Sequence, residues 1–409
     1  MTKKSDAPAI RFKGFSDAWE QRKLTEFVEF FSGLTYTPND VQENGTLVLR
    51  SSNVSNGEVV DADNIYVNPQ VVNSENVKVG DIVVVVRNGS RSLIGKHAQI
   101  KAFMSNTVIG AFMTGIRSEC PEFTNALLNT SRFEEEIAMN MGATINQITG
   151  YMFSKMEFKV PCLDEQKKIG EYFEKLDNLI TLHQRKFEKL KNVKKSMLEK
   201  MFPQNGSSYP EIRFKGFTDP WEQRNFADVV QIERGGSPRP IDDYITDSQN
   251  GLNWVKIGDA PAQGHYITKT AEKIRPEGLS KTREVHPGDL ILSNSMSFGK
   301  PYIMGIDGCI HDGWLLIRDT NSTFDLTFLC HLLGTPQMLD QYRSLAAGST
   351  VNNLNKELVG NTVVTIPTID EQRVLGQYLE RLDNLITLHQ RELEKLQNIK
   401  KSMLEKMFV

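Results

Sequence analysis

The stretch DEQKKIGEYFEKLDNLITLHQRKFEKLKNVKKSMLEKMF at residues 164–202 decides the fold, because the chain carries it twice. Residues 370–408 read DEQRVLGQYLERLDNLITLHQRELEKLQNIKKSMLEKMF, with about three quarters of the positions identical and LDNLITLHQR unchanged. A second repeated pair lies upstream, IRFKGFSDAWEQR at 10–22 and IRFKGFTDPWEQR at 212–224. The chain is therefore a tandem duplication, in which a short head, a variable segment and a long tail occur twice.

The two tails are predicted to be long helices. Apolar residues recur at steps of three and four, acidic residues begin each tail, and lysines crowd its end, as the helix dipole favours. Asp164 and Asp370 follow Pro161 and Pro367, and we expect them to cap the helices. At 1.5 Å per residue each helix would be roughly 55 Å long. Because so long an apolar stripe needs a partner, we expect the two copies to pack on each other as a coiled coil.

A histidine stands on the stripe in each copy. It is either a ligand or pH switch, or a polar residue that fixes the register of the helices. The second interpretation is favoured, because nothing beside either histidine supplies the further ligands that a metal needs. The residues expected between the helices are Leu176, Ile180, His183, Phe187, Leu190, Leu382, Ile386, His389, Leu393 and Leu396.

Composition sets the broad class of protein. A chain of 409 residues is too long for one ordinary core, and 39% hydrophobic with 24% charged residues is ordinary for a soluble globular protein. No apolar run reaches the roughly 18 residues of a membrane span, and the first residues lack the apolar core of a secretory signal. The cysteines Cys120, Cys162, Cys309 and Cys330 form no CxxC pair and no zinc spacing, which predicts buried thiols in a reducing cytoplasm.

The variable segments 23–163 and 225–369 differ in sequence but follow the same order of signals. Each has a short apolar strand that runs into a polar cluster, then a Gly-Asp turn before an apolar run, and finally a Gly/Thr/Asn-rich loop before the tail. This pattern predicts short strands in a mixed α/β domain. The matching stretches are TLVLRSSNVSNG at 46–57 with LNWVKIGDAPAQG at 252–264, and KVGDIVVVVRNGS at 78–90 with HPGDLILSNSMSFGK at 286–300.

Side chains that can bind DNA follow the predicted strands in both segments. Arg, Lys, Asn and Ser read base edges and bind phosphates. Each is more often a solvated loop residue when taken alone, but two sets at equivalent places favour a binding surface. A formal charge of −3 argues against a histone-like coat and leaves room for a local patch. The candidates are Arg50, Ser51, Ser52, Asn53, Asn88, Ser90, Arg91, Lys96 and His97, and Lys256, Asp259, Ser293, Asn294, Ser295, Ser297 and Lys300.

Enzyme signatures fail. GSRSLIGKH at 89–97 has five residues between its glycines and His97 after the lysine, whereas a phosphate loop needs four and a Ser or Thr. Histidines, cysteines and carboxylates do not cluster in the sequence as a triad or a metal site. Two alternatives stay open: a stand-alone DNA-modifying enzyme, and a structural coiled-coil protein without a DNA partner.

The whole arrangement resembles the specificity subunit of type I restriction–modification systems. The RFKGF heads, the GDIV and GDLI runs and the DEQ and LDNLITLHQR tails carry the resemblance, which covers essentially the whole chain. It implies an α+β fold with two mixed α/β target recognition domains, two long antiparallel helices in a coiled coil, and a pseudo-twofold tandem repeat. The implied domains are recognition domain 1 (1–163), spacer helix 1 (164–205), recognition domain 2 (206–369) and spacer helix 2 (370–409).

The resemblance also implies a function. Each recognition domain would read one half of a split target in double-stranded DNA, and the helices would set the distance between them. The helices would also dock two methyltransferase subunits, to which two restriction and translocase subunits can add. The chain itself would be non-catalytic, cytoplasmic and off the membrane, with S-adenosylmethionine, ATP and magnesium on its partners. Two copies in one chain offer two equivalent faces to two identical partners, which gives the duplication a physical reason.

Overall fold

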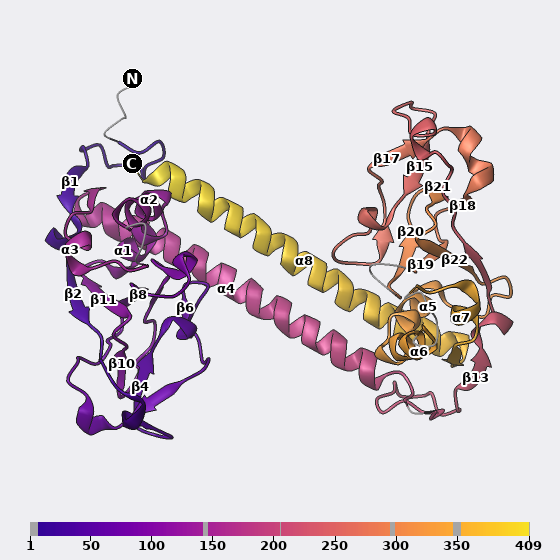
Figure 1. The fold of residues 1–409 in the computed structure, drawn as a ribbon, viewed down its shortest axis with the longest axis horizontal. Coiled ribbons are helices and arrows are strands. Elements are labelled where there is room, and N and C mark those ends of the chain that lie inside the picture. The colour runs from indigo at the N-terminus through magenta and orange to yellow at the C-terminus, as the bar shows by residue number, and fades with distance from the viewer. Residues whose placement is uncertain (1–6, 142–145, 205, 295–298, 347–352, 409) are drawn as a thin grey trace. The chain divides into compact units, whose positions relative to one another are not determined.

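The computed structural model describes residues 7–141, 146–204, 206–294, 299–346 and 353–408. The chain divides into two compact units, and the two long helices can be followed in Figure 1. Unit 1 comprises Met1–Leu182 and Leu393–Val409, and unit 2 comprises His183–Glu392. The boundaries between the units fall within both long helices, so each unit contains part of the first helix and part of the second.

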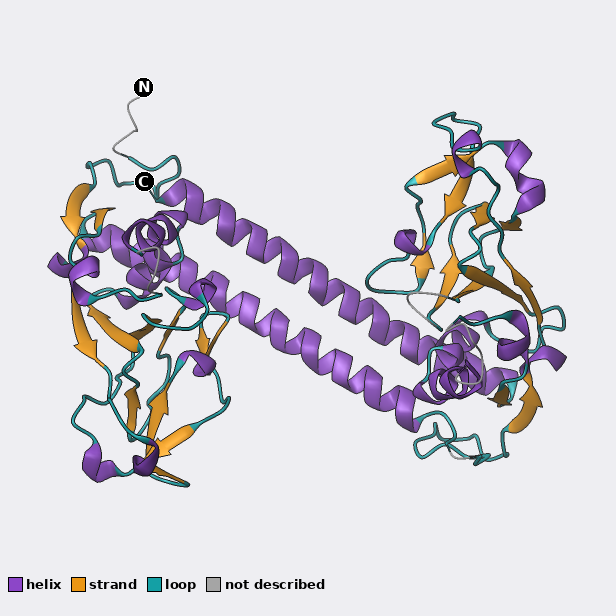
Figure 2. Cartoon of the chain, viewed as in Figure 1, coloured by secondary structure: helices purple, strands orange, loops and turns teal. Residues whose placement is uncertain are grey.

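Unit 1 is a mixed domain of short strands and helices (Figure 2). Its elements are β1 (Glu20–Lys23), β2 (Val28–Ser32), β3 (Val41–Gln42), β4 (Thr46–Leu49), β5 (Val54–Ser55), β6 (Glu58–Val59), β7 (Ile65–Val67), β8 (Ile82–Val85), β9 (His97–Gln99), β10 (Thr107–Ile109), β11 (Met113–Ser118), β12 (Glu157–Val160), α1 (Pro121–Leu128), α2 (Ser131–Asn140), α3 (Gly150–Phe153) and the first part of α4 (Leu163–Lys200). The strands pair in the orders β2-β11-β8-β9 and β10-β4-β7-β3, with the smaller pairs β1-β12 and β5-β6.

Unit 2 repeats this plan with other residues. Its elements are β13 (Glu222–Asn225), β14 (Gln231–Arg234), β15 (Leu252–Val255), β16 (Tyr266–Ile267), β17 (Glu272–Ile274), β18 (Arg283–Val285), β19 (Leu290–Ser293), β20 (Pro301–Met304), β21 (Gly308–Ile310), β22 (Trp314–Arg318), β23 (Val363–Ile366), α5 (Leu326–Leu333), α6 (Pro336–Ala346), α7 (Lys356–Gly360) and most of α8 (Ile369–Met407). The strand orders are β14-β22-β19-β20-β16 and β17-β15-β21-β18, with the pair β13-β23.

The predicted Gly-Asp turns occupy the same place in both units. They precede β8 and β19, whose four residues are all buried, as the apolar runs predict. Gly80 and Gly288 adopt φ of +93° and +94°, a conformation that favours glycine. The aspartates that follow accept the backbone N–H of Lys78 at 2.8 Å in unit 1 and of His286 at 2.9 Å in unit 2. The two variable segments therefore fold on equivalent backbones.

The repeated heads hold the beginnings of the repeated tails. Arg11 donates to the Glu165 carboxylate from Nε at 2.6 Å and from Nη2 at 2.8 Å. Arg213 makes the same pair of bonds to Glu371, at 2.7 and 2.8 Å. Both carboxylates are buried, so each charge depends on its arginine. This clamp explains why the heads are repeated together with the tails.

The ends of the tails are also packed alike. Phe202, which follows α4, meets Trp221 edge to face in unit 2, with ring centroids 6.0 Å apart at 86°. Phe408, which follows α8, meets Trp19 in unit 1 at 6.0 Å and 87°. Each long helix therefore begins in the core of one unit and ends in the core of the other, which accounts for the conserved Met-Phe ending of both copies.

Within each unit the parts of α4 and α8 run antiparallel, as predicted. In unit 1 Lys400 lies 2.6 Å from Asp177, and in unit 2 Lys194 pairs with Asp383. The helices have 38 and 39 residues, which corresponds to lengths of about 57 and 59 Å at 1.5 Å per residue. Of the predicted packing residues, Leu176, Leu382, Ile386 and Leu393 are buried, and Ile180, His183, Phe187, Leu190, His389 and Leu396 are half-buried.

Two local predictions were wrong. Asp164 and Asp370 do not cap the helices, because α4 and α8 begin one residue earlier and both aspartates lie in the first turn. Cys162 is exposed, whereas the other three cysteines are buried thiols as predicted. In the described part of the chain, no helix is long and apolar enough to cross a membrane.

Candidate nucleic-acid interface

Matching loops follow the strands β4 and β15. Each loop is a short 3-10 turn, in which the third residue accepts a hydrogen bond from the backbone N–H of the residue that precedes the turn. Asn53 Oδ1 accepts from Arg50 at 2.9 Å, and Asp259 Oδ2 accepts from Lys256 at 2.8 Å. The sequences RSSN and KIGD therefore build one backbone shape with different side chains.

The basic residues that open these turns are held by carboxylates. The Arg50 guanidinium lies 2.7 Å from a carboxylate oxygen of Asp63, and Lys256 is paired with Glu272. Both pairs are partly exposed, so solvent screens them and they are weak. A phosphate or a base edge can therefore compete with either carboxylate for its cation.

The structure contradicts the DNA contact predicted for Asn53. Its side chain is completely buried, and its amide donates to the carbonyl of Ala62 and to Asn64, both at 2.8 Å. These bonds hold the loop closed. The neighbouring Ser52 is exposed and open to a ligand, and Ser51 is half-buried.

The loop after β8 joins the loop after β4. Asn88 Nδ2 donates to Ser51 Oγ at 3.0 Å, and Asn88 Oδ1 accepts from the backbone N–H of Ser90 at 2.9 Å. Asn146 Nδ2, from the loop before α3, donates to the carbonyl of Gly89 at 3.1 Å. Residues far apart in sequence are thus brought together in one loop cluster of unit 1.

Three further candidates lie around this loop. Arg91 is exposed at the start of a 3-10 turn, and Lys96 is half-buried. His97 is 8% exposed, and burial lowers its pKa below the ordinary value, so the ring is neutral. Its Nδ1 lies 2.9 Å from the carbonyl oxygen of Gly95. His97 is therefore part of the core, and the predicted DNA contact is wrong for this residue.

Arg87 and Phe112 form a further candidate contact, which the sequence pattern did not indicate. The Arg87 guanidinium lies over the Phe112 ring, 5.0 Å from its centroid, and Phe112 is 55% exposed. An exposed aromatic ring beside an arginine can stack on an unpaired base or contact a thymine methyl group. The available signal was an aromatic residue directly before a strand and two residues after a glycine, in GAFMTG.

In unit 2 some polar side chains at the end of β19 and in the loop after it are buried and bond to the backbone. Ser293 and Asn294 are buried; Ser293 Oγ accepts from the backbone N–H of Lys300 at 2.9 Å, and Asn294 Nδ2 donates to the carbonyl of Asp312 at 2.8 Å. The structure therefore contradicts direct DNA contacts for these two. The candidates Ser295 and Ser297 lie outside the described residues. Lys300 is half-buried, and its ammonium lies 5.2 Å from the centroid of the Tyr302 ring.

A second group in unit 2 was also missed. Asp312 accepts from Ser237 Oγ at 3.0 Å and lies 3.8 Å from Arg239, which is 82% exposed in its side chain. The loop that carries Ser237 and Arg239 approaches the backbone of His311 closely at Gly235, where an added Cβ would lie 2.2 Å from the carbonyl oxygen of His311. The signal was present in RGGSPRP, since paired glycines followed by Arg and Pro mark a tight loop with an exposed cation.

Each unit has an equivalent backbone hydrogen bond between the loop after its buried strand (β8 or β19) and the loop before its short helix (α3 or α7). The N–H of Ile148 donates to the carbonyl of Val86 at 2.8 Å, and the N–H of Leu354 donates to the carbonyl of Asn294 at 3.0 Å. Each unit thus presents loops from the same places of the same fold. Arg87, Arg91 and Phe112 face solvent in unit 1, and Arg239 does so in unit 2. This arrangement can bind two different ligands of one chemical class.

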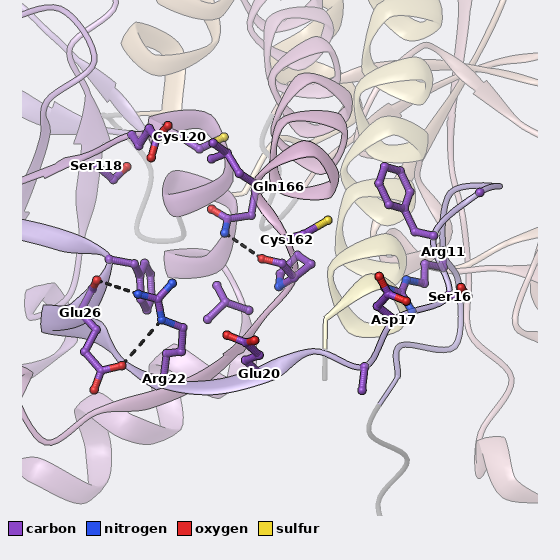
Figure 3. A pocket seen from close by; sticks show the side chains of 18 residues that line it. Arg11, Ser16, Asp17, Glu20, Arg22, Glu26, Ser118, Cys120, Cys162 and Gln166 are labelled. Carbon is purple, nitrogen blue, oxygen red and sulfur yellow. Dashed lines mark hydrogen bonds and ion pairs between the residues drawn. The ribbon is translucent and has the colours of Figure 1, made fainter.

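A separate cavity of about 400 Å³ lies in unit 1 between the head and the start of α4 (Figure 3). Arg22 donates to the carbonyl of Glu26 at 2.9 Å, and Gln166 donates to the carbonyl of Pro161 at 2.9 Å. Burial raises the pKa of the Cys120 thiol, which keeps it protonated and a poor nucleophile. The described residues that line this cavity include no histidine that could act as a base for it.

The repeated helices expose identical apolar residues. Leu179 and Leu182 are 44% and 46% exposed in unit 1, and their counterparts Leu385 and Leu388 are 43% and 51% exposed in unit 2. Core packing cannot explain why exposed side chains stay identical in two copies. A partner that binds both faces in the same way can explain it.

The fold and the loop clusters define a duplicated two-domain recognition protein, with unlike loops on equivalent backbones and repeated helices. The chain belongs to the family of type I restriction modification DNA specificity domains, whose model matches residues 16–192 and again residues 218–398.

Two named relatives agree with this family. The chain is 24% identical over 275 residues to the type I restriction enzyme MjaVIII specificity subunit of Methanocaldococcus jannaschii, a match that covers 64% of this chain and 64% of that protein. It is 22% identical over 255 residues to the EcoKI specificity subunit of Escherichia coli, covering 59% and 55%. The chain thus spans less than two thirds of the length of these relatives.

A solved structure has the same fold. The S subunit of a type I restriction–modification system from M. genitalium matches with a TM-score of 0.68 at 14% identity, over 98% of this chain and 99% of that one. At this identity the match speaks for the fold, and the α+β tandem repeat predicted from the sequence is confirmed.

Proposed function

We propose that this chain is the DNA-recognition subunit of a type I restriction–modification complex, which reads a split target in double-stranded DNA with its two domains. One observation supports this most: the exposed side chains differ between the domains on equivalent loops, yet are identical in the LDNLITLHQR segment that both helices carry. Different ligands on one side and identical partners on the other account for both facts.

The proposed DNA-binding residues are cations on the loops, of which Lys300 is half-buried and the others are exposed. Arg91 and Arg87 serve unit 1, and Arg239 with Lys300 serves unit 2. Arginine makes bidentate contacts to guanine, and lysine binds phosphate as a point charge. Because the two sets differ in residue type and in the carboxylates around them, the two half-sites differ in sequence.

The proposed docking faces are the exposed leucines of the repeated helices. Leu179 with Leu182, and Leu385 with Leu388, would each receive one methyltransferase subunit, and two restriction and translocase subunits would add to these. S-adenosylmethionine, ATP and magnesium belong to the partners in this proposal, and the chain itself catalyses no step. The cytoplasmic location of the chain stays a prediction.

A structural coiled-coil protein without a DNA partner is the second candidate. It accounts for the helix pairing but gives no role to the exposed cations on the loops of the two units, Arg87 and Arg91 in unit 1 and Arg239 in unit 2. A stand-alone DNA-modifying enzyme requires a nucleophile or a base in the loop clusters. Cys120 is protonated and lies away from them, and His97 is part of the core.

The test is a selection from a random-sequence DNA pool, with and without a methyltransferase partner of this family. We expect one split sequence with two unlike halves and a fixed spacer, recovered strongly only with the partner. The chain alone should bind weakly, because a net charge of −3 gives little attraction to phosphates. Recovery of no sequence under either condition would favour the structural coiled-coil candidate.

A further inference from the structure

Unit 2 contains a group of potential metal ligands that the proposed function does not use. His265 lies in the loop before β16, His331 on α5 and Asp383 on α8. One ligand atom from each lies within 4.8 Å of the other two. In the described part of the chain, this is the group of His, Cys, Asp and Glu side chains close enough to hold a metal ion.

The separations suit a tetrahedral ion. Nε2 of His265 lies 2.9 Å from Oδ2 of Asp383, and Nε2 of His331 lies 3.8 Å from the same oxygen. Two ligands held about 2.0–2.1 Å from zinc at a tetrahedral angle are about 3.3 Å apart. The two observed distances lie on either side of this value, so small side-chain adjustments would bring the ligands into place.

His331 provides an independent sign of a ligand. Its side chain is 2% exposed, and its Nε2 has no hydrogen-bond partner among the described residues. A buried polar atom without a partner is costly, and a neutral imidazole nitrogen is the form that binds a metal.

We propose that His265, His331 and Asp383 form a zinc site that fastens α8 to α5 and to the loop before β16. Two imidazoles and one carboxylate are a donor set that zinc accepts, and the fourth position is filled by a further side chain or by water. Cys330 is a free, buried thiol that interacts with His265, but its Sγ does not belong to the group of mutually close ligand atoms, so water is the expected fourth ligand.

Lys194 contacts two of the three proposed ligands and would have to move when an ion binds. Its ammonium contacts Asp383 and lies 3.3 Å from Nε2 of His265. It also lines a cavity of about 300 Å³ together with His265 and Asp383, so the lysine has room to swing aside. Zinc would take over the charge of Asp383 and would replace the proton that His265 carries while it is paired with this carboxylate.

Unit 1 offers a built-in comparison. Lys400 and Asp177 form the same ion pair there, because both residues belong to the repeated block. Phe123 of α1 and Phe328 of α5 are equivalent residues. The position three residues after each is Ala126 in α1 and His331 in α5. The ion pair is thus present in both units. In unit 1 a single histidine, His97, lies near it, and among the described residues only unit 2 brings two histidines to the pair.

The test uses the full-length chain, stripped with a chelator and titrated with zinc against a chromophoric competitor. We expect one tight zinc equivalent, with affinity at least about tenfold weaker in His265→Gln and in His331→Gln, since even removal of residues that orient ligands costs 10–100-fold. Asp177→Asn, in the matching ion pair of unit 1, and His183→Gln, in the other histidine pair, should bind zinc as the parent does.

Two further readouts complete the test. Zinc should raise the melting temperature of the parent and not that of His265→Gln, because a ligand stabilises the state that binds it. Cobalt should give a tetrahedral spectrum without a thiolate charge-transfer band, because water is the expected fourth ligand. Should His331→Gln fail to fold, His265→Gln decides, because this residue lies in a loop. Equal zinc affinity of the parent and His265→Gln would overturn the proposal and leave a metal-free ion-pair network.

Discussion

The repeated helices and the variable domains differ in where their two copies agree. In the LDNLITLHQR segment the helices are identical even at exposed positions such as Leu182 and Leu388, whereas the domains share a buried backbone plan and differ on their exposed loops. Surface residues usually vary more readily than buried ones. Identity on an exposed helix face is what the proposed binding of the same partner twice requires, and difference on equivalent loops is what the proposed binding of two unlike half-sites requires.

The largest expected effect is a loss of stability when the buried arginine–glutamate pair that both copies share is broken. Glu165→Ala and Glu371→Ala each leave an arginine without its carboxylate, and breaking such a buried pair costs about 3–5 kcal/mol. We expect nearly equal losses in the free energy of unfolding, because the two clamps have the same geometry. Glu222→Ala is the control, since its exposed pair with Arg224 contributes about 0–1 kcal/mol. Losses that differ widely between the two clamps would show that the units are not equivalent.

The next effect concerns the exposed leucines. Leu182→Asp and Leu388→Asp should each abolish the binding of one methyltransferase subunit, at a cost of about 2 kcal/mol or more, because central apolar contacts dominate interfaces. Mass measurement of the assembled complex should give one partner for either variant and none for the double variant. Two partners bound to the double variant would place the docking face elsewhere.

A smaller effect should separate the two loop clusters. Arg91→Ala and Arg239→Ala should each cost about 1–3 kcal/mol on the selected target, and each should relax a base position in a different half-site. Lys300→Ala should weaken all sequences alike and flatten the salt dependence, as a phosphate contact does. Arg50→Ala should have less effect, because Arg50 is already paired with Asp63. The measurement is titration of target and scrambled DNA at two salt concentrations; unchanged binding of all four variants would remove the DNA face from these loops.

The smallest effect concerns the two repeated histidines of unit 2. Nδ1 of His183 and Nδ1 of His389 lie 3.1 Å apart, and burial, followed by the charges of His183 and Lys186, lowers the pKa of His389. The folded chain then binds fewer protons than the unfolded chain, so stability present above about pH 6.5 is lost as the pH falls below it. We expect a shallow fall in the free energy of unfolding on acidification, and a smaller fall in His389→Gln. An equal slope in both proteins would contradict this.

The sequence predicted the elements that depend on local pattern. The long helices, their pairing and the Gly-Asp turns all follow from periodicity and repetition, and the structure has them. It did not predict that Asn53, Asn294 and His97 are buried, because a polar residue in a loop looks the same whether it binds a ligand or a backbone carbonyl. His265 and His331 meet through contacts between residues far apart in the chain, which no spacing rule reveals.

The most direct test of the central claim exchanges one domain. Residues 23–163 are replaced by the corresponding segment of a relative with another target, and the bound DNA is selected again from a random pool in the presence of the methyltransferase partner. The account predicts that one half-site changes while the other half-site and the bound number of partners stay the same. A change in both half-sites, or the loss of a partner, would contradict the separation between variable domains that read DNA and repeated helices that assemble the complex.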